Sequence, residues 1–301
     1  MYAGRIDEGL DLLDMLAGEV GVRIPQHRWT VWWELVKGQI HLAIRGLGFR
    51  PRPSSDTGSV ELDRVRTLGA IAVQYGPLDP FRGAVPTLRY LLAALELGDR
   101  DELTTALGFE AVLRSALGWR SGALRLLSVL GDLSSDSSSG KGRTWAAMSH
   151  SFLAINVGDR AEAQTCSAQA FEHMAGLAAV PPWLLSLAHY IDGFSLMFDL
   201  RTASFGRVLA FVEEREERSG PCSELRLRAS ALQAHHLLVG RPEAVLAMVD
   251  DARWTSATRR DVTFRTVAET YAPVAHLYLG DPHRALVVAH RVAGVLAQEA
   301  L

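Results

Sequence analysis

Apolar residues recur along this chain with the spacing of α-helices, most clearly in segment 144–174. The segment reads T-W-A-A-M-S-H-S-F-L-A-I-N-V-G-D-R-A-E-A-Q-T-C-S-A-Q-A-F-E-H-M, with helical periodicity on both sides of Val157-Gly158-Asp159. Glycine can end a helix in the left-handed conformation, and aspartate can cap the helix that follows. The pattern therefore predicts two antiparallel helices joined by a tight turn.

The same turn signal returns at intervals of about 40 residues. It is found at Gly118-Trp119, Gly158-Asp159, Asp199-Leu200, Gly240-Arg241 and Gly280-Asp281. The Asp199 turn lacks the glycine and is assigned by its spacing alone. Ala123, Ala163 and Ala285 each lie five residues after their glycine, where a small residue lets two helices approach closely. A common period indicates stacked helical hairpins rather than isolated turns.

The first part of the chain, 1–98, is helical but less regular. Helices are predicted over 10–20, 26–45 and 60–75, and again after the Asp79-Pro80 cap. The second of these helices contains Trp29, Trp32 and Trp33 together with Leu35, Val36, Ile40 and Ile44. Aromatic residues dominate core burial, so packing in the core is the preferred interpretation of these tryptophans over stacking on a ligand. Segments 46–58 and 134–142 are predicted to be loops because Pro, Gly and Ser cluster there.

Composition and charge narrow the class of protein. The 301 residues are 48% hydrophobic and 22% charged, with a formal net charge of −3. Because there is no basic stripe, nucleic acid is disfavoured as a partner. The two cysteines, Cys166 and Cys222, lack a CxxC spacing and are predicted to be packed thiols in a reducing compartment. Neither a signal peptide nor a membrane span fits the sequence, so we expect a cytoplasmic protein that makes no membrane contact.

Searches for catalytic and metal-binding motifs lead to no candidate. Gly140-Lys141 lacks the earlier glycine and the following Ser or Thr of a phosphate loop. His276, His283 and His290 are seven residues apart, but the Gly280-Asp281 turn separates them. Carboxylate pairs such as Glu213-Glu214 lie among arginines, as on a solvated helix face. The sequence therefore predicts a protein that is not an enzyme and binds no cofactor or metal.

Two resemblances give these patterns a context. Gly158 to Ala163, with Ala170 and Glu172, resembles the turn and second helix of a tetratricopeptide repeat. The first helix departs from that repeat, and the period of about 40 exceeds its usual 34. The whole chain resembles the helical-repeat region that follows the kinase and AAA-type (STAND) ATPase modules of large bacterial eukaryote-like serine/threonine kinases. The residues that carry this resemblance are G-R-I-D-E-G-L-D-L-L-D, L-D-P-F-R-G-A, R-Y-L-L-A-A-L-E-L-G, E-E-R-E-E-R-S-G and H-L-Y-L-G-D.

The resemblance implies a region that senses or docks, while the catalytic modules lie upstream. The opening segment also reads as the second helix of a hairpin without its first, so we expect the chain to begin inside a larger protein. The predicted fold is all-α, a right-handed superhelix of about six antiparallel hairpins forming one domain over 1–301. Repeats are more regular over 99–301 than over 1–98.

A solenoid of this kind offers a concave surface to a protein or peptide, including kinase or ATPase modules of the same polypeptide. Counting back from Gly158 in tetratricopeptide register places Trp145, Met148, Phe152 and Ile155 on the inward face. The equivalent count places His189 there in the next repeat. Two alternatives stay open: these residues could pack against neighbouring helices, or the groove could bind a small molecule that controls a linked ATPase or kinase.

Overall fold

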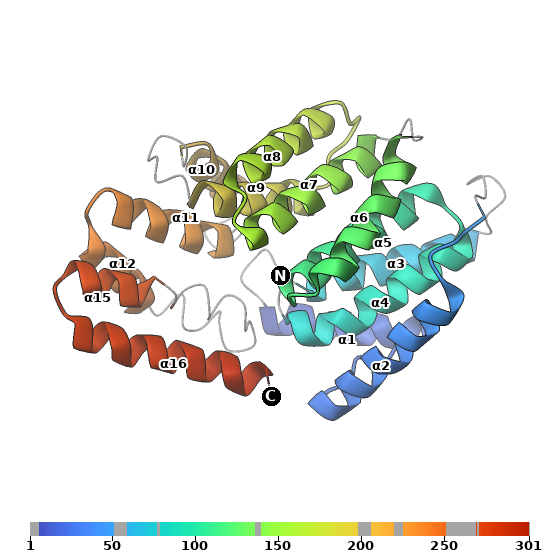
Figure 1. Cartoon of the computed structure of the whole chain (residues 1–301), viewed down its shortest axis with the longest axis horizontal. Coiled ribbons are helices and arrows are strands. Elements are labelled where there is room, and N and C mark those ends of the chain that lie inside the picture. The colour runs from blue at the N-terminus through green and yellow to red at the C-terminus, as the bar shows by residue number, and fades with distance from the viewer. Residues whose placement is uncertain are drawn as a thin grey trace. The chain divides into compact units, whose positions relative to one another are not determined.

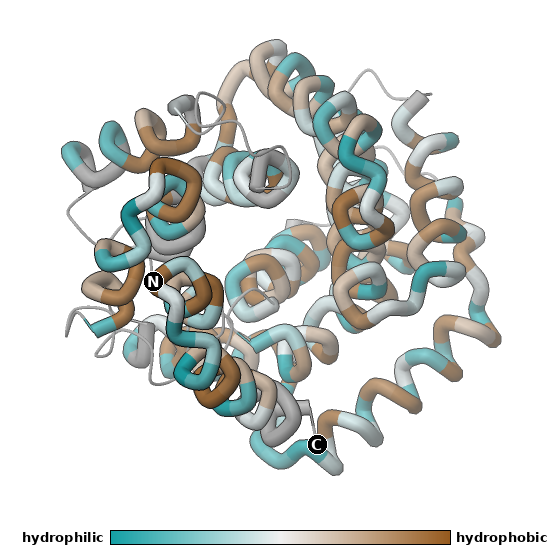
Figure 2. The backbone as a smooth tube through the Cα atoms, turned by 60° about the vertical axis from the view of Figure 1, so that its left-hand side comes forward, coloured by the Kyte–Doolittle hydropathy of each residue, from teal (hydrophilic) through white to brown (hydrophobic). Residues whose placement is uncertain are grey.

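A computed structural model describes residues 6–50, 59–76, 79–135, 140–197, 206–219, 225–250, 269 and 271–300. Within these ranges every regular element is an α-helix, as the sequence predicts (Figure 1). Brown and teal segments alternate within the helices in Figure 2, which is the pattern of helices with an apolar side. None of the described helices combines the length and apolarity needed to cross a membrane.

The helices group into two compact units, which are described separately. One unit is Asp11–Leu184, and the other combines Met1–Leu10 with Leu185–Leu301. That residues 1–301 form a single helical-repeat domain, less regular over 1–98 than over 99–301, stays a prediction. The helices of the first half are α1 Ile6–Glu19, α2 Arg28–Arg45, α3 Ser59–Tyr75, α4 Pro80–Leu97, α5 Arg100–Ala116, α6 Arg120–Ser135, α7 Gly140–Val157 and α8 Arg160–Ala175. Those of the second half are α9 Pro182–Met197, α10 Gly206–Ser219, α11 Leu225–Leu238, α12 Pro242–Asp250, α15 Ala272–Tyr278 and α16 Pro282–Ala300.

In the Asp11–Leu184 unit, the helices from α3 to α8 each pack side by side with the next helix in sequence (Figure 1). Helix α5 contacts α4 and α6, its chain neighbours, and also α7, the first helix of the next hairpin. Helix α7 in turn packs against α6 and α8, while α2 packs against α4. The largest fully buried side chains of this unit include Tyr90, Leu91, Leu103, Leu107 and Trp145.

In the Leu185–Leu301 unit, contacts run from α10 to α11, then to α12, α15 and α16. One buried cluster joins α10 and α11 and contains Val208, Phe211, Val212 and Ala234. A second cluster joins α11, α12 and α15 and contains Leu237, Val245 and Ala275. Leu185 and Tyr190 of α9 and Tyr271 before α15 pack against the first cluster, so it brings together more than two neighbouring helices.

Four of the five predicted turns adopt the same backbone geometry. Gly118, Gly158, Gly240 and Gly280 have φ between 73° and 79°. In each turn the glycine N–H donates to the carbonyl three residues back, and the next N–H donates to the carbonyl five residues back. This hydrogen-bond pattern ends a helix and reverses the chain. Ala123, Ala163 and Ala285 are buried as expected. The predicted turn at Asp199 lies outside the described residues.

The core role predicted for the tryptophans of α2 is wrong. Trp29, Trp32 and Trp33 are 87%, 49% and 61% exposed, and Val36, Ile40 and Ile44 are also exposed. The residues of α2 that are buried are Val31, Leu35 and Leu42. Since α2 is apolar on two opposite faces, periodicity alone could not indicate which face meets α4. Leu35 is the one member of the predicted set that does pack in the core.

One smaller prediction changes, and the predicted Asp79-Pro80 helix start is confirmed. The loop predicted over 134–142 is shorter, because α6 continues to Ser135 and α7 begins at Gly140. Gly140 and Lys141 therefore belong to a helix. Pro86 lies inside α4, which begins at Pro80 with the Asp79 carboxylate accepting a hydrogen bond from the Arg82 N–H.

Candidate functional site

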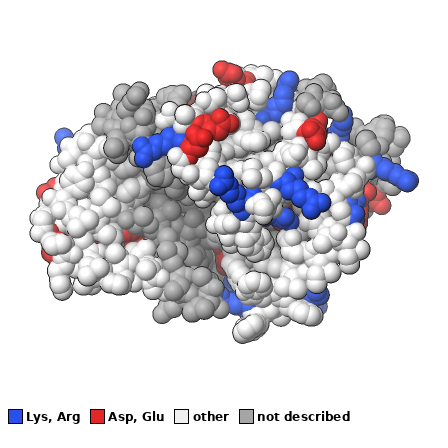
Figure 3. Space-filling view, viewed as in Figure 1, with Lys and Arg blue, Asp and Glu red and all other residues white. Residues whose placement is uncertain are grey.

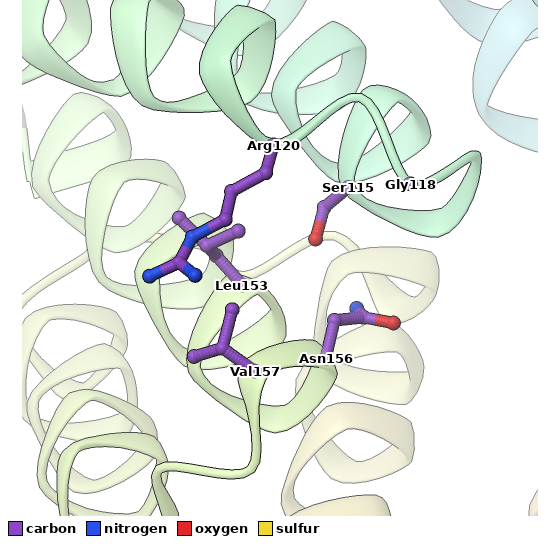
Figure 4. A pocket seen from close by; sticks show the side chains of 6 residues that line it. All are labelled: Ser115, Gly118, Arg120, Leu153, Asn156 and Val157. Atoms are coloured by element: carbon purple, nitrogen blue, oxygen red, sulfur yellow. The ribbon is translucent and has the colours of Figure 1, made fainter.

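A pocket opens where α5 and α7 end side by side (Figure 4). It has a volume of about 280 Å³ and is lined by Ser115, Gly118, Arg120, Leu153, Asn156 and Val157. The Gly118 turn carries the chain from α5 into α6, so Ser115 and Arg120 approach the pocket from one hairpin. Leu153, Asn156 and Val157 come from the last two turns of α7, in the following hairpin.

The polar groups of this pocket are placed at different depths. Ser115 is 6% exposed, and its hydroxyl has no hydrogen-bond partner among the described residues. The Asn156 amide group donates from Nδ2 to the Phe152 carbonyl at 2.8 Å, which leaves its carboxamide oxygen as an acceptor. The Arg120 side chain is exposed at the rim and is the one cationic group in the lining.

The pocket is suited to binding rather than to proton transfer or nucleophilic attack. Its six lining residues include no carboxylate, imidazole or thiol. The Ser115 hydroxyl and Arg120 guanidinium are donors for an acceptor oxygen, while Leu153 and Val157 offer apolar contact. A short side chain or small molecule with one carbonyl or carboxylate oxygen and an apolar part fits these groups.

The five residues predicted to bind a partner occupy different environments. Trp145 is fully buried in the Asp11–Leu184 unit, with ring centroids 5.9 Å from Phe109 and 6.0 Å from Trp183. Met148 is also buried, and Phe152 and Ile155 are partly buried. His189 belongs to the other unit, where its ring stacks on Phe211 at 3.9 Å. Partner binding by these residues stays a prediction.

The pocket lies beside this predicted set without including it. Leu153 and Asn156 follow directly after Phe152 and Ile155 in α7, on another side of the helix. The tetratricopeptide register and the pocket thus point to the same helix, α7, through different side chains. The sequence feature that could have indicated the pocket is the repeated turn. A period of about 40 residues places Ser115 of one repeat beside the end of α7 in the next repeat.

A buried ionic network joins α2 and α5 in the same unit. The Glu110 carboxylate accepts from Arg114 Nε at 2.8 Å, and Arg114 Nη2 donates to the Gln39 carboxamide at 3.0 Å. Burial raises the pKa of Glu110, and the charge of Arg114 opposes this shift. The second carboxylate oxygen is buried without a hydrogen-bond partner among the described residues. None of the six pocket-lining residues belongs to this network, which links α2 to α5.

A second carboxylate, Glu102, connects four helices. Its Oε2 accepts from the Tyr90 hydroxyl at 2.8 Å, and its Oε1 lies 3.6 Å from Arg66 and 3.7 Å from Lys141. Burial, followed by the nearby Glu102 charge, raises the pKa of Tyr90 well above its ordinary value. Lys141, which failed the phosphate-loop test in the sequence, thus forms an ion pair that links α7 to α5.

Metal binding finds no support in the part of the chain that the structure describes, where no three His, Cys, Asp or Glu side chains gather around a common point. Cys166 packs in the core as predicted, whereas Cys222 lies outside the described residues. Comparison with protein-family models, with curated proteins and with solved structures finds no match to this chain.

Proposed function

We propose that this chain is a non-catalytic helical-repeat module that binds a protein or peptide. The observation that carries the proposal is the shared geometry of the turns at Gly118, Gly158, Gly240 and Gly280. The packing of α5 on α7, the first helices of consecutive hairpins, also supports a right-handed tetratricopeptide-like superhelix. In such an array each added hairpin extends one continuous binding surface.

The pocket at the ends of α5 and α7 is the proposed contact point for the partner. It lies between consecutive hairpins, where a superhelix presents its side chains to an extended ligand. A peptide side chain with an acceptor oxygen, such as Glu, Gln, Asp or Asn, would accept hydrogen bonds from Ser115 and Arg120. Charge-assisted bonds from arginine to a carboxylate are the stronger of these options.

The cellular setting follows from the resemblance to the repeat region of bacterial kinases with STAND ATPase modules. In that setting the module would act in the cytoplasm and regulate a kinase or ATPase on the same polypeptide. Figure 3 shows Lys/Arg and Asp/Glu side chains in small groups on a largely uncharged face, which suits contact with another protein. Sequencing the DNA that flanks this coding segment should find a kinase or ATPase reading frame in phase with it.

A small-molecule sensor is the second candidate function. The specific observation in its favour is the pocket volume of about 280 Å³ together with the buried Ser115 hydroxyl, which finds no hydrogen-bond partner in the described part of the chain. Ligand pockets in proteins begin at roughly 300 Å³, so a small metabolite with a carboxylate or carbonyl group would fill this space. Binding would then change the activity of the linked ATPase or kinase.

Peptide selection followed by calorimetry distinguishes these functions. A peptide selected on the immobilised protein should bind about tenfold more weakly to Arg120→Ala and Ser115→Ala, since each hydrogen bond to a charged group contributes roughly 1.5 kcal/mol. Arg125→Ala is the matched control, because Arg125 is exposed on the same helix but does not line the pocket. Selected peptides that bind all variants equally would exclude this pocket as the site. Metabolites that raise the melting temperature only when Arg120 is present would favour the sensor.

A further inference from the structure

The outer face of α2 carries an unbroken apolar stripe. Its members are Trp29, Trp33, Val36, Ile40 and Ile44, with Trp32 on its edge, and their exposures are 87%, 61%, 36%, 55%, 82% and 49%. Steps of four, three, four and four residues place the first five on one side of a helix. No charged residue interrupts this set, which is called the α2 stripe below.

Contacts on the opposite side of α2 hold the α2 stripe outward. A Cβ atom on Gly38 would lie 2.5 Å from Leu88 Cδ2, so this glycine lets α2 approach α4 closely. At the end of α2, Arg45 Nη2 donates to the Leu95 carbonyl at 2.8 Å. Near the middle, Arg89 Nη2 lies 2.8 Å from the Glu34 carboxylate. Because α2 is fixed along its length, the α2 stripe is a preformed surface.

The α2 stripe is large enough to supply much of a stable interface. A tryptophan buries roughly 150–250 Å² when fully covered, so these three offer about 300–500 Å² at their observed exposures. A stable interface buries about 800 Å² per partner. The tryptophans therefore provide about half of that area, and Val36, Ile40 and Ile44 add to it. Tryptophan is also among the residues that dominate binding energy at interfaces.

We propose that the α2 stripe binds the α2 stripe of a second copy of this chain, in an antiparallel helix pair. Trp29, Trp33, Val36 and Ile40 follow the alternating four- and three-residue steps of a coiled-coil seam. An antiparallel pair places Trp29 opposite Ile40 of the second copy, and Trp33 opposite Val36. Each large ring thus meets a smaller aliphatic side chain, which gives the seam an even width.

The charges beside the α2 stripe favour self-association over a lipid surface. Helices that lie on membranes carry free Lys and Arg side chains that contact anionic lipids. In α2, the Arg28 guanidinium lies over the Phe81 ring at 5.4 Å, and Arg45 donates to backbone carbonyls. Lys37 forms an ion pair with Glu34 of the same helix. Arg28, Lys37 and Arg45 are therefore each engaged by groups of the same chain, Lys37 at the surface with its side chain 48% exposed, while the α2 stripe itself is neutral.

Sedimentation of the full chain over a wide concentration range tests the proposal. The parent protein should approach twice its monomer mass of 32.9 kDa. The double variant Trp33→Glu, Ile40→Glu should dissociate at least ~30-fold more readily, because two central apolar contacts are replaced by like charges. Val60→Glu is the matched control, since Val60 is 80% exposed on α3 but lies outside the α2 stripe, and it should dimerise as the parent does.

Two further measurements test the same interface, and the first of them does not depend on the folding of the double variant. Dilution of the parent should shift tryptophan emission to longer wavelength as the α2 stripe becomes exposed. Mixing the glutamate variant with a Trp33→Lys, Ile40→Lys variant should restore the dimer, because the two stripes then carry opposite charges. A parent that is monomeric at every concentration overturns the proposal. So does a dimer that is insensitive to Trp33→Glu, Ile40→Glu, or a monomer that binds phosphatidylcholine–phosphatidylserine vesicles through Trp33 and Ile40.

Discussion

Gly158 ends α7 and reverses the chain into α8. Its φ of 79° is in the left-handed region, where a side chain other than hydrogen is strained. We expect Gly158→Ala to lower the free energy of unfolding by about 1 kcal/mol. Gly131 is the matched control, because it lies inside α6 with nothing within 4 Å of an added Cβ. Gly131→Ala should raise the same free energy by about 0.5–1 kcal/mol. Urea titration of both variants checks this, and equal effects would contradict it.

Glu110 should make stability depend on pH. Its carboxyl pKa is 4.5 in the unfolded chain and is raised by burial in the folded chain. Between these two values the folded chain binds more protons, so the free energy of unfolding falls as pH rises through this window. The loss amounts to about 1.4 kcal/mol for each unit of difference. Above the folded pKa the loss is complete and stability no longer changes on account of this residue.

Glu110→Gln removes this titration and keeps an oxygen for Arg114 to contact. We expect urea midpoints, measured from pH 4 upward, to fall less steeply with pH in the variant than in the parent. The expectation is contradicted if the urea midpoint of the parent falls no more steeply with pH than the midpoint of the variant. The comparison of slopes is informative even if the substitution changes the absolute stability.

At the scale of single elements, α5 and α7 approach each other closely where they cross. A Cβ on Gly108 would lie 3.0 Å from the Trp145 ring, and the Ser149 hydroxyl donates to the Gly108 carbonyl at 3.1 Å. Trp145 also contacts Phe109 edge to face. The two helices thus depend on one large side chain that fills the space left by a glycine.

We therefore expect Trp145→Ala to lower the free energy of unfolding by about 3–5 kcal/mol, because it leaves a cavity between α5 and α7. Trp119→Ala is the matched control, since Trp119 is 43% exposed at the turn after α5. That substitution should cost less than ~1 kcal/mol. Chemical denaturation followed by circular dichroism measures both. Equal losses would show that Trp145 does not support this crossing.

The same elements show how far the sequence could predict the fold. Glycine followed by aspartate or another polar residue predicted the turns at Gly158 and Gly280, because the left-handed conformation is a local property of the chain. The side of α2 that becomes buried is not determined by the sequence of α2 alone. It depends on Leu88 fitting against Gly38, a contact between helices 50 residues apart in sequence.

The candidate pocket was harder to predict for a related reason. The period of about 40 indicates that the ends of α5 and α7 are neighbours. It does not indicate the directions of Ser115 and Asn156, which depend on the rotation of each helix about its axis. The tetratricopeptide register assumes one rotation of α7 about its axis and assigns Trp145 and Met148 to the inward face. In the structure both side chains are buried in the core.

At the scale of the whole molecule, the two compact units place the proposed functions in one part of the chain. The pocket at Ser115 and the α2 stripe both belong to the Asp11–Leu184 unit. The pocket is at the ends of α5 and α7, while the α2 stripe faces away from α4. Dimerisation through α2 would therefore double the number of pockets, and a partner with two matching segments would gain avidity from this arrangement.

This grouping leads to a prediction about residues 1–184 produced alone. The packing partners of α2 to α8 lie within the Asp11–Leu184 unit, and Trp183 remains present to contact Trp145. We expect this segment to unfold cooperatively with a free energy of about 5–15 kcal/mol, as compact domains do. Circular dichroism and tryptophan fluorescence should report the same guanidinium midpoint. Residues 1–158 are the control, because they lack α8 and expose one side of α7. That shorter segment should lose cooperativity, and a cooperative 1–158 or a non-cooperative 1–184 would show that the unit is held together by other contacts.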